Sequence, residues 1–233
     1  MTRVRSWLTG ILLFTVAAML FVRTASGDMA LYIHPRYEVL IYFCGAILFA
    51  FAIICITMPI SIPGHSVQFL LIPVLLGVLI APRALGAEAI SHQGTALNQI
   101  VQRPQATTPN VVAVDTTQWN IYEWAVAASI DPLALKGKPV QIDGFVVRNP
   151  DMQLATDQFM LARYVITCCV ADAGGVGMHV QWANSASYHN DQWVHVEGII
   201  DVHQVNGVMQ PLVIAHSVAQ ITIPAKPYII PHK

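Results

Sequence analysis

The chain has 233 residues, of which 55% are hydrophobic and only 11% are charged, and its formal net charge is −1. Soluble domains carry about 25% charged residues, so this composition excludes an ordinary soluble chain. The near-neutral balance gives no electrostatic basis for a nucleic-acid partner. Four cysteines are too few and too scattered for a disulfide-built secreted scaffold.

The first 83 residues form the expected membrane region, with three apolar segments at residues 6–22, 39–58 and 67–81. No charged side chain occurs between Glu38 and Arg83, a stretch too long for one buried core helix. The second segment has about the 20 residues that a spanning helix needs. The third is shorter and contains Pro73, so that it either crosses together with flanking residues or re-enters the membrane. We expect the lipid bilayer to surround this region.

The orientation of these segments rests on two signals that conflict. The first segment has a basic start and is followed by the small residues 25–27, which a cleaved signal peptide also shows. Further apolar segments follow at once, which favours an uncleaved span in a multi-pass protein. A signal-anchor start predicts an extracytoplasmic C-terminal region, although the distribution of arginines does not favour an internal N-terminus.

A polar, proline-containing stretch at residues 84–117 is expected to be a linker. Residues 118–233 are expected to form one domain, a helix followed by a small barrel. Apolar residues recur at helical spacing over 116–129, and Thr116 or Thr117 is the expected cap.

The rest of the second domain reads as five short strands. They are expected at 139–147, 158–168, 176–182, 193–202 and 209–223. Asn206-Gly207 is a strong signal for a hairpin between the last two. Five strands over about 90 residues suit a closed OB-like β-barrel, with a sandwich as the alternative. The predicted fold class is therefore α+β: N-terminal transmembrane helices followed by an all-β, OB-like domain.

The adjacent pair Cys168-Cys169 is the most informative motif, with Asp172 three residues later. Neighbouring strand residues point to opposite faces, so one cysteine can be buried while the other is presented. A thiolate is a soft metal ligand and a redox nucleophile. Burial of both cysteines as small core residues is the alternative.

Other candidate ligands lie in the predicted barrel. His195 and Glu197 share one strand face, and His179 precedes them, so all three are candidate metal ligands beside Cys168-Cys169 and Asp172. The expected metal is a transition metal such as zinc. The sequence contains no CxxC pair and no HExxH motif, so the spacing of these residues does not identify the metal.

Enzyme signatures are absent from the sequence. It contains no Gly-x-Ser-x-Gly elbow, no phosphate-binding loop ending in Lys-Ser/Thr and no dinucleotide fingerprint. We therefore expect a protein that is not an enzyme.

Several segments together resemble the YcgQ-like family of bacterial permease subunits. They are residues 33–37, 137–146, 159–163, 166–173 and 223–229. The resemblance covers essentially the whole chain, and the string Ile-Thr-Cys-Cys-x-Ala-Asp-Ala is its most specific part.

The resemblance implies a bacterial plasma-membrane subunit that accompanies a larger multi-span permease, with metal-ion handling as the suspected activity. It marks His34, Arg163, Cys168, Cys169 and Asp172 as candidate ligand-binding residues. Our first hypothesis is an accessory transport subunit whose barrel binds a metal ion or small ligand. A redox-sensing or thiol-exchange membrane protein and a membrane-anchored scaffold with structural cysteines are the alternatives.

Overall fold

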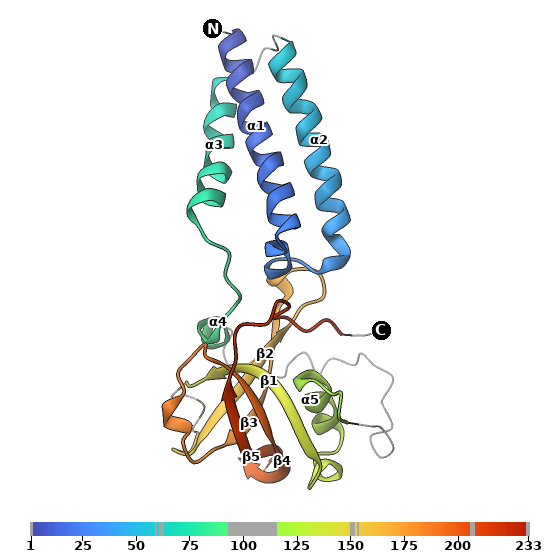
Figure 1. Ribbon diagram of the computed structural model, residues 1–233, viewed down its shortest axis with the longest axis vertical. Helices are drawn as coiled ribbons and strands as arrows, with labels where there is room; N and C mark the ends of the chain where they lie inside the picture. The colour runs from blue at the N-terminus through green and yellow to red at the C-terminus, as the bar shows by residue number, and fades with distance from the viewer. Residues whose placement is uncertain are drawn as a thin grey trace. The chain divides into compact units, whose positions relative to one another are not determined.

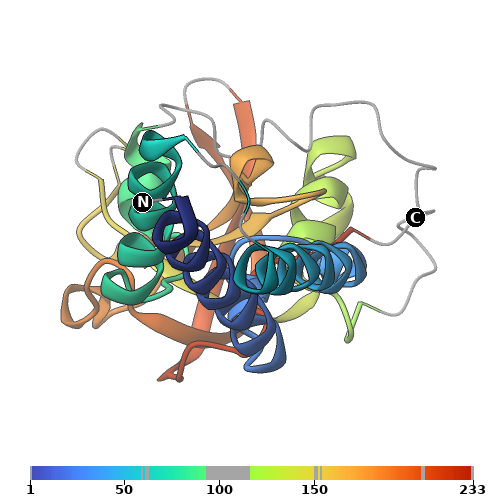
Figure 2. The same cartoon turned by 90° about the horizontal axis from the view of Figure 1, so that it is seen from above.

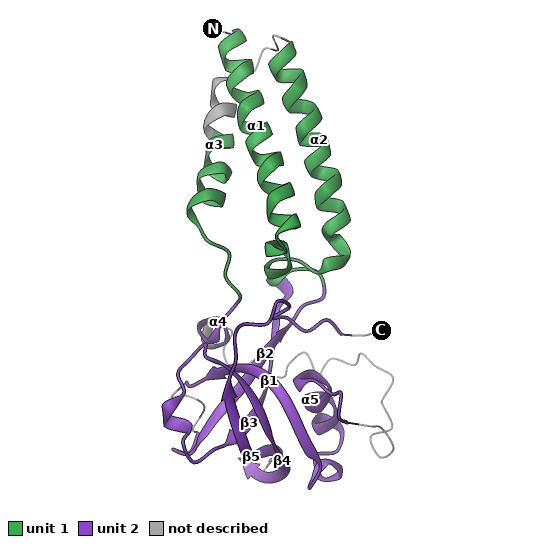
Figure 3. Ribbon diagram, in the orientation of Figure 1, with its two compact units in different colours: residues 1–84, 168–170 green, residues 85–167, 171–233 purple. Residues whose placement is uncertain are grey.

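A computed structural model describes residues 2–58, 60, 63–92, 116–149, 152, 154–205 and 208–231 of the chain. Two compact units make up the chain (Figure 3). The helical unit is Met1–Ala84 with Cys168–Val170, and the barrel unit is Leu85–Thr167 with Ala171–Lys233.

The helical unit contains α1 (Thr2–Ala25), α2 (Glu38–Thr57) and α3 (Gly64–Leu79). Within this unit α1 lies between the other two helices (Figures 1 and 2). Two segments, Arg3–Ala25 and Pro35–Thr57, are long and apolar enough to cross a membrane, as the sequence predicts. The third helix has 16 residues and contains Pro73, so that its crossing stays a prediction.

Small side chains let α1 and α2 approach closely. Ala17 is fully buried, and a Cβ atom on Gly10 would lie 2.6 Å from Cγ1 of Ile56. Ser6 Oγ donates a hydrogen bond of 2.7 Å to the carbonyl oxygen of Cys55. Small residues and interhelical hydrogen bonds are what hold helices together in lipid, where apolar contact alone gives no driving force.

The outer faces of the same helices are apolar. Val39 and Phe43 of α2 are 73% and 64% exposed, and Phe69 of α3 is 72% exposed. Exposed apolar patches of this extent are typical of surfaces that contact lipid or another protein.

The barrel unit contains five strands: β1 (Pro139–Val147), β2 (Gln158–Val165), β3 (Gly174–Gln181), β4 (Trp193–Val205) and β5 (Val208–Gln220). The five predicted strands are confirmed, but β2 ends three residues before the predicted end at 168. The predicted Asn206-Gly207 turn lies outside the described residues. Short 3-10 turns connect the elements of both units: Asp28–Leu31, Pro35–Tyr37, Leu133–Leu135, Val170–Asp172 and Ser185–Ser187.

The strands close into a barrel in the order β1-β2-β3-β5-β4, with β1 returning to β4 (Figure 1). All neighbouring pairs are antiparallel except β3 and β5, which are parallel. This closed five-stranded ring is the expected OB-like arrangement and replaces the sandwich alternative.

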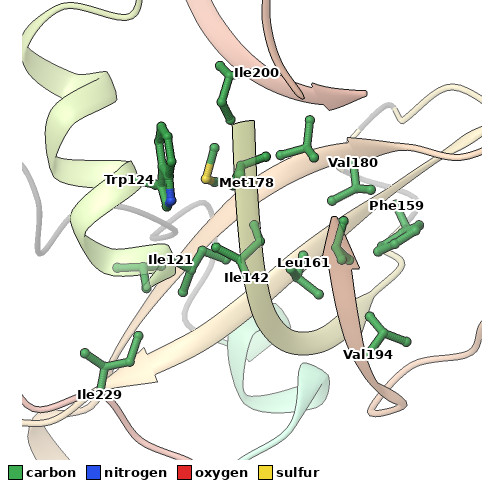
Figure 4. Close-up of a cluster of buried hydrophobic side chains, with 14 of the residues drawn as sticks. Ile121, Trp124, Ile142, Phe159, Leu161, Met178, Val180, Val194, Ile200 and Ile229 are labelled. Atoms are coloured by element: carbon green, nitrogen blue, oxygen red, sulfur yellow. The ribbon is translucent and has the colours of Figure 1, made fainter. Parts of the chain in front are cut away.

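The barrel core is built from inward-pointing residues of all five strands and one face of a helix, α5 (Ile121–Ile130). Trp124 of α5 and Phe159 of β2 are fully buried, and Met178 of β3 is 2% exposed (Figure 4). In Figure 4, Trp124 lies beside Met178, so that α5 covers part of the core. Buried and exposed positions alternate in the first half of β1, as the period of two in a strand predicts, whereas the second half of β1 and most of β2 and β3 are buried on both faces.

The start of α5 differs from the prediction. Asn120, not Thr116 or Thr117, caps the helix, and its Oδ1 accepts a hydrogen bond of 2.9 Å from the backbone N–H of Tyr122. Glu123 Oε2 accepts a bond of 2.7 Å from the Asn120 N–H, which completes a capping box. The helix therefore begins later than the predicted residue 116.

The range expected as a linker, 84–117, contains α4 (Ala87–His92) at its start. Tyr164 Oη donates a hydrogen bond of 2.9 Å to the carbonyl oxygen of Gly86, and the Ala87 N–H donates one of 2.5 Å to Asp191 Oδ1. The first residues of this range are thus attached to the barrel. Residues 93–115 lie outside the described residues.

Candidate functional site

The Cys168-Cys169 segment follows the end of β2 and is part of the helical unit. Cys169 forms an isolated antiparallel bridge with Ile33, in the link between α1 and α2. The His34 N–H donates a hydrogen bond of 2.9 Å to the carbonyl oxygen of Cys168. Two regions that the sequence marks separately, His34 and the cysteine pair, are therefore neighbours through their backbones.

The two sulfur atoms of the pair lie 3.6 Å apart and are not in a disulfide. Cys168 is exposed and Cys169 is half-buried, so the alternative in which both are core residues does not describe Cys168. Two thiolates that share one tetrahedral zinc ion, each at about 2.3 Å from it, lie about 3.8 Å apart. The sulfur separation is thus compatible with two ligands of one soft ion.

His34 contributes its backbone to this segment, while its ring has another contact. The ring Nδ1 accepts a hydrogen bond of 2.9 Å from the backbone N–H of Arg36, at the start of a 3-10 turn. The ring of Tyr37 lies edge-on to it, with 6.1 Å between ring centroids. These contacts hold His34 in place, and with it the backbone N–H that donates to the carbonyl oxygen of Cys168.

Asp172 shapes the turn that carries the cysteines. Its Oδ1 accepts a hydrogen bond of 3.1 Å from the backbone N–H of Thr167, across the intervening Cys168-Cys169 pair. Side-chain bonds of this kind are how aspartate stabilises turns. The structure thus gives Asp172 a turn-forming role, and its role as a metal ligand stays a prediction.

Arg163 has a separate place on β2. It donates hydrogen bonds of 3.2 Å and 2.9 Å to the carbonyl oxygens of Pro227 and Lys226, and its guanidinium carbon lies 5.6 Å from the centroid of the Trp193 ring. Burial lowers the pKa of Arg163, and the nearby Asp143 carboxylate opposes this shift. Arg163 thus attaches the C-terminal segment to the barrel wall.

His179 of β3 pairs with His203 of β4. The Nδ1 of His179 lies 3.4 Å from the Nε2 of His203, and the rings are stacked with 5.4 Å between centroids. Burial, and to a lesser degree the neighbouring His203, lower the pKa of His179. The two ring nitrogens are close enough for one of them to donate a hydrogen bond to the other.

His195 and Glu197 lie together on the outer face of β4, as their spacing predicts. The Nε2 of His195 is 3.4 Å from Glu197 Oε1, and its Nδ1 is 2.5 Å from Asp143 Oδ1 on β1. His216 of β5 places its Nε2 3.8 Å from Glu197 Oε2. The hydrogen bond with Asp143 is the main cause of a raised pKa at His195.

Asp143 and His216 are the two residues of this cluster that the sequence reasoning did not single out. Asp143 faces His195 in the β1–β4 register, and His216 lies next to the register shift between β4 and β5. Strand alternation alone predicts that Asp143 points outward, but only the register shows which residue it faces.

The candidate ligands do not form one completed metal centre. Among the described residues, no three His, Cys, Asp or Glu side chains already converge as a metal-binding group. The cysteines belong to the helical unit, while His179, His195 and Glu197 belong to the barrel unit.

Comparison with known proteins places the barrel unit in a family. The family described as the DUF1980 C-terminal domain matches residues 97–231, more than half of the chain. The chain belongs to this family. The DUF1980 C-terminal domain thus comprises α5, the five strands and the cysteine segment.

A relative from Streptococcus mutans is similar over nearly its whole length. It is 23% identical over 252 residues, which cover 88% of this chain and 92% of the relative. That protein is named "Putative two-component membrane permease complex subunit". The alignment extends beyond the DUF1980 C-terminal domain, so the likeness includes part of the N-terminal helical region.

Proposed function

We propose that this chain is an accessory, non-catalytic subunit of a membrane permease complex, of the YcgQ-like kind that its motifs resemble. The near full-length likeness to a permease complex subunit supports this role. The apolar outer faces of α1 and α2 support a position in the bacterial plasma membrane beside a larger multi-span permease. The C-terminal domain lies on the extracytoplasmic side in this proposal.

The cargo that we propose is a soft or borderline transition-metal ion such as Zn²⁺, held by the thiolates of Cys168 and Cys169. The observation that carries this is the 3.6 Å separation of two sulfur atoms on a segment where Cys168 is exposed. Two thiolates fill only half of a tetrahedral shell. The remaining positions are left for water or for side chains of the permease, which suits transfer of the ion better than permanent storage.

Metal analysis of the purified full-length chain in detergent tests the cargo. The wild type, a Cys168→Ser/Cys169→Ser variant and a Cys44→Ser/Cys55→Ser control are loaded with Zn²⁺, desalted and checked for folding. The tag used for purification contains no histidine. We expect the wild type and the control each to bind one more zinc ion per chain than the Cys168→Ser/Cys169→Ser variant. Equal zinc in all three proteins would contradict the proposal.

Thiol exchange is the second candidate function, because the same exposed sulfur is accessible to other thiols. Adjacent cysteines form a strained disulfide, so the exchange partner would be an external thiol. Alkylation of Cys168 faster than that of glutathione at pH 7 would favour this function. A rate no faster than glutathione, together with no bound metal, would leave the scaffold role.

A membrane-impermeant maleimide tests the orientation in intact cells. Modification of Cys168 without permeabilising the membrane is expected for an extracytoplasmic domain. Modification only after permeabilisation would reverse the assignment, and a Cys168→Ser variant shows that the reaction is specific.

A further inference from the structure

The outer face of the barrel carries a cluster of two histidines and two carboxylates, Asp143, His195, Glu197 and His216, from three strands. His195 and Glu197 are two residues apart on β4, so they point to the same side. Asp143 of β1 lies opposite His195 in the register. The cluster is remote in sequence from Cys168-Cys169 and uses nitrogen and oxygen donors only.

A local irregularity brings β5 to this cluster. The register between β4 and β5 shifts between Glu197 and Gly198, which places His216 next to Glu197. A Cβ atom on Gly198 would lie 2.4 Å from the carbonyl oxygen of Ile214, so only glycine allows the strands to approach this closely here. Bulges of this type re-aim side chains and are frequent beside functional sites.

The orientation of His195 is set by Asp143. A carboxylate on Nδ1 favours the tautomer in which that nitrogen carries the proton, so that Nε2, which faces Glu197, is the nitrogen that can bind a cation once its own proton is displaced. Two nitrogen or oxygen ligands of one tetrahedral zinc ion, each at about 2.0–2.1 Å, lie about 3.4 Å apart. The Nε2 of His195 and the Oε1 of Glu197 are 3.4 Å apart.

We propose that His195, Glu197 and His216 bind a borderline divalent cation such as Zn²⁺, and that Asp143 is the positioning residue for His195. Carboxylate–histidine–metal arrangements of this kind hold many zinc ligands. The side chain of His216 is 65% exposed and lies 3.8 Å from the other carboxylate oxygen, so its ring has space to rotate onto the ion. The described residues show no converged group of three ligands, so this proposal requires the His216 ring to rotate onto the ion.

This cation site is independent of the proposed thiolate cargo site. The test therefore uses the full-length Cys168→Ser/Cys169→Ser chain as its parent, purified in detergent with a tag that contains no histidine. Titration with Co²⁺ is expected to give a saturable tetrahedral d–d spectrum without the near-ultraviolet charge-transfer band of a thiolate ligand. Competition with Zn²⁺ then gives the zinc affinity.

Four variants of this parent locate the ligands. Glu197→Gln and His216→Asn are each expected to weaken Zn²⁺ binding by more than about 100-fold, and Asp143→Asn by about 10- to 100-fold, as an orienting partner does. His189→Asn, which changes an exposed histidine in another loop, should leave the affinity unchanged. Tryptophan fluorescence and unfolding curves confirm that each variant is folded.

Two results would overturn the proposal. One is the absence of saturable Co²⁺ binding by the folded parent, and the other is unchanged affinity in both Glu197→Gln and His216→Asn. Neither result concerns zinc bound by Cys168 and Cys169, because the parent lacks these two thiolates. In the same way, failure of Cys168 and Cys169 to bind zinc would not contradict the cation site on the barrel.

Discussion

The helical unit and the barrel unit are both rich in apolar residues, but they place them in opposite ways. Phe43 of α2 is 64% exposed, whereas Phe159 of β2 is fully buried. In the helices the small residues face each other and the large ones face outward, while in the barrel the large ones face inward. Phenylalanine therefore contacts the surroundings of the helical unit, whereas in the barrel unit it stabilises the fold by packing in the core.

The sharpest test of this comparison replaces one phenylalanine in each unit by alanine. We expect Phe159→Ala to lower the free energy of unfolding of the barrel by about 3–5 kcal/mol, because it leaves a cavity in the core. Phe43→Ala leaves no internal cavity and should change that free energy little. Urea unfolding of the full chain in detergent, followed by tryptophan fluorescence, measures both. Similar losses from the two variants would refute the contrast.

The helix starts sharpen the comparison at a smaller scale. α5 begins with a capping box at Asn120, whereas Tyr37, at the start of α2, makes no side-chain capping bond. Asn120→Ala should lower the free energy of unfolding of the barrel by about 1 kcal/mol. Thr116→Ala, at the position that the sequence suggests as the cap, serves as the control and should have almost no effect. The same unfolding assay decides between the two residues.

The pH dependence of the barrel should give the smallest effect. His179 has a lowered pKa in the folded chain, so the unfolded state binds more protons below its ordinary pKa of 6.5. Its contribution to stability is therefore present above that pH and is lost as the pH falls through the lowered pKa. As the pH falls from 7.5 to 5.5, we expect the free energy of unfolding of the wild type to decrease more than that of the His179→Asn variant. A difference that is constant with pH would contradict this assignment.

The strands were predictable because their signals are local. The Pro139–Val147 strand has the predicted bounds, since its apolar residues alternate and a turn precedes it. β2 was predicted to run to 168 because Ile166 and Thr167 continue the β-branched pattern. The chain leaves the sheet earlier, since Ile166 donates its N–H to Ile229 and Cys169 pairs with Ile33. Such distant pairings have no signature in the segment itself.

The sequence identifies single candidate residues of each site, but it does not show which of them lie together in the fold. The sequence marks Cys168-Cys169 and His34, and only the fold shows that they meet through backbone hydrogen bonds. It marks His195 and Glu197 as sharing a face, because two residues in a strand always do. Their further neighbours depend on strand register and on one irregularity, which a period of two does not specify.

Closure of the barrel also limits how another protein can attach to it. An open sheet offers unpaired N–H and C=O groups along its outermost strand, and a peptide from a partner can extend the sheet there. In this domain the first strand pairs with β4, so the ring has no outermost strand. A permease that docks on the barrel must therefore recognise side chains and loops. Substitutions of surface residues should change which partner the barrel binds without changing the sheet.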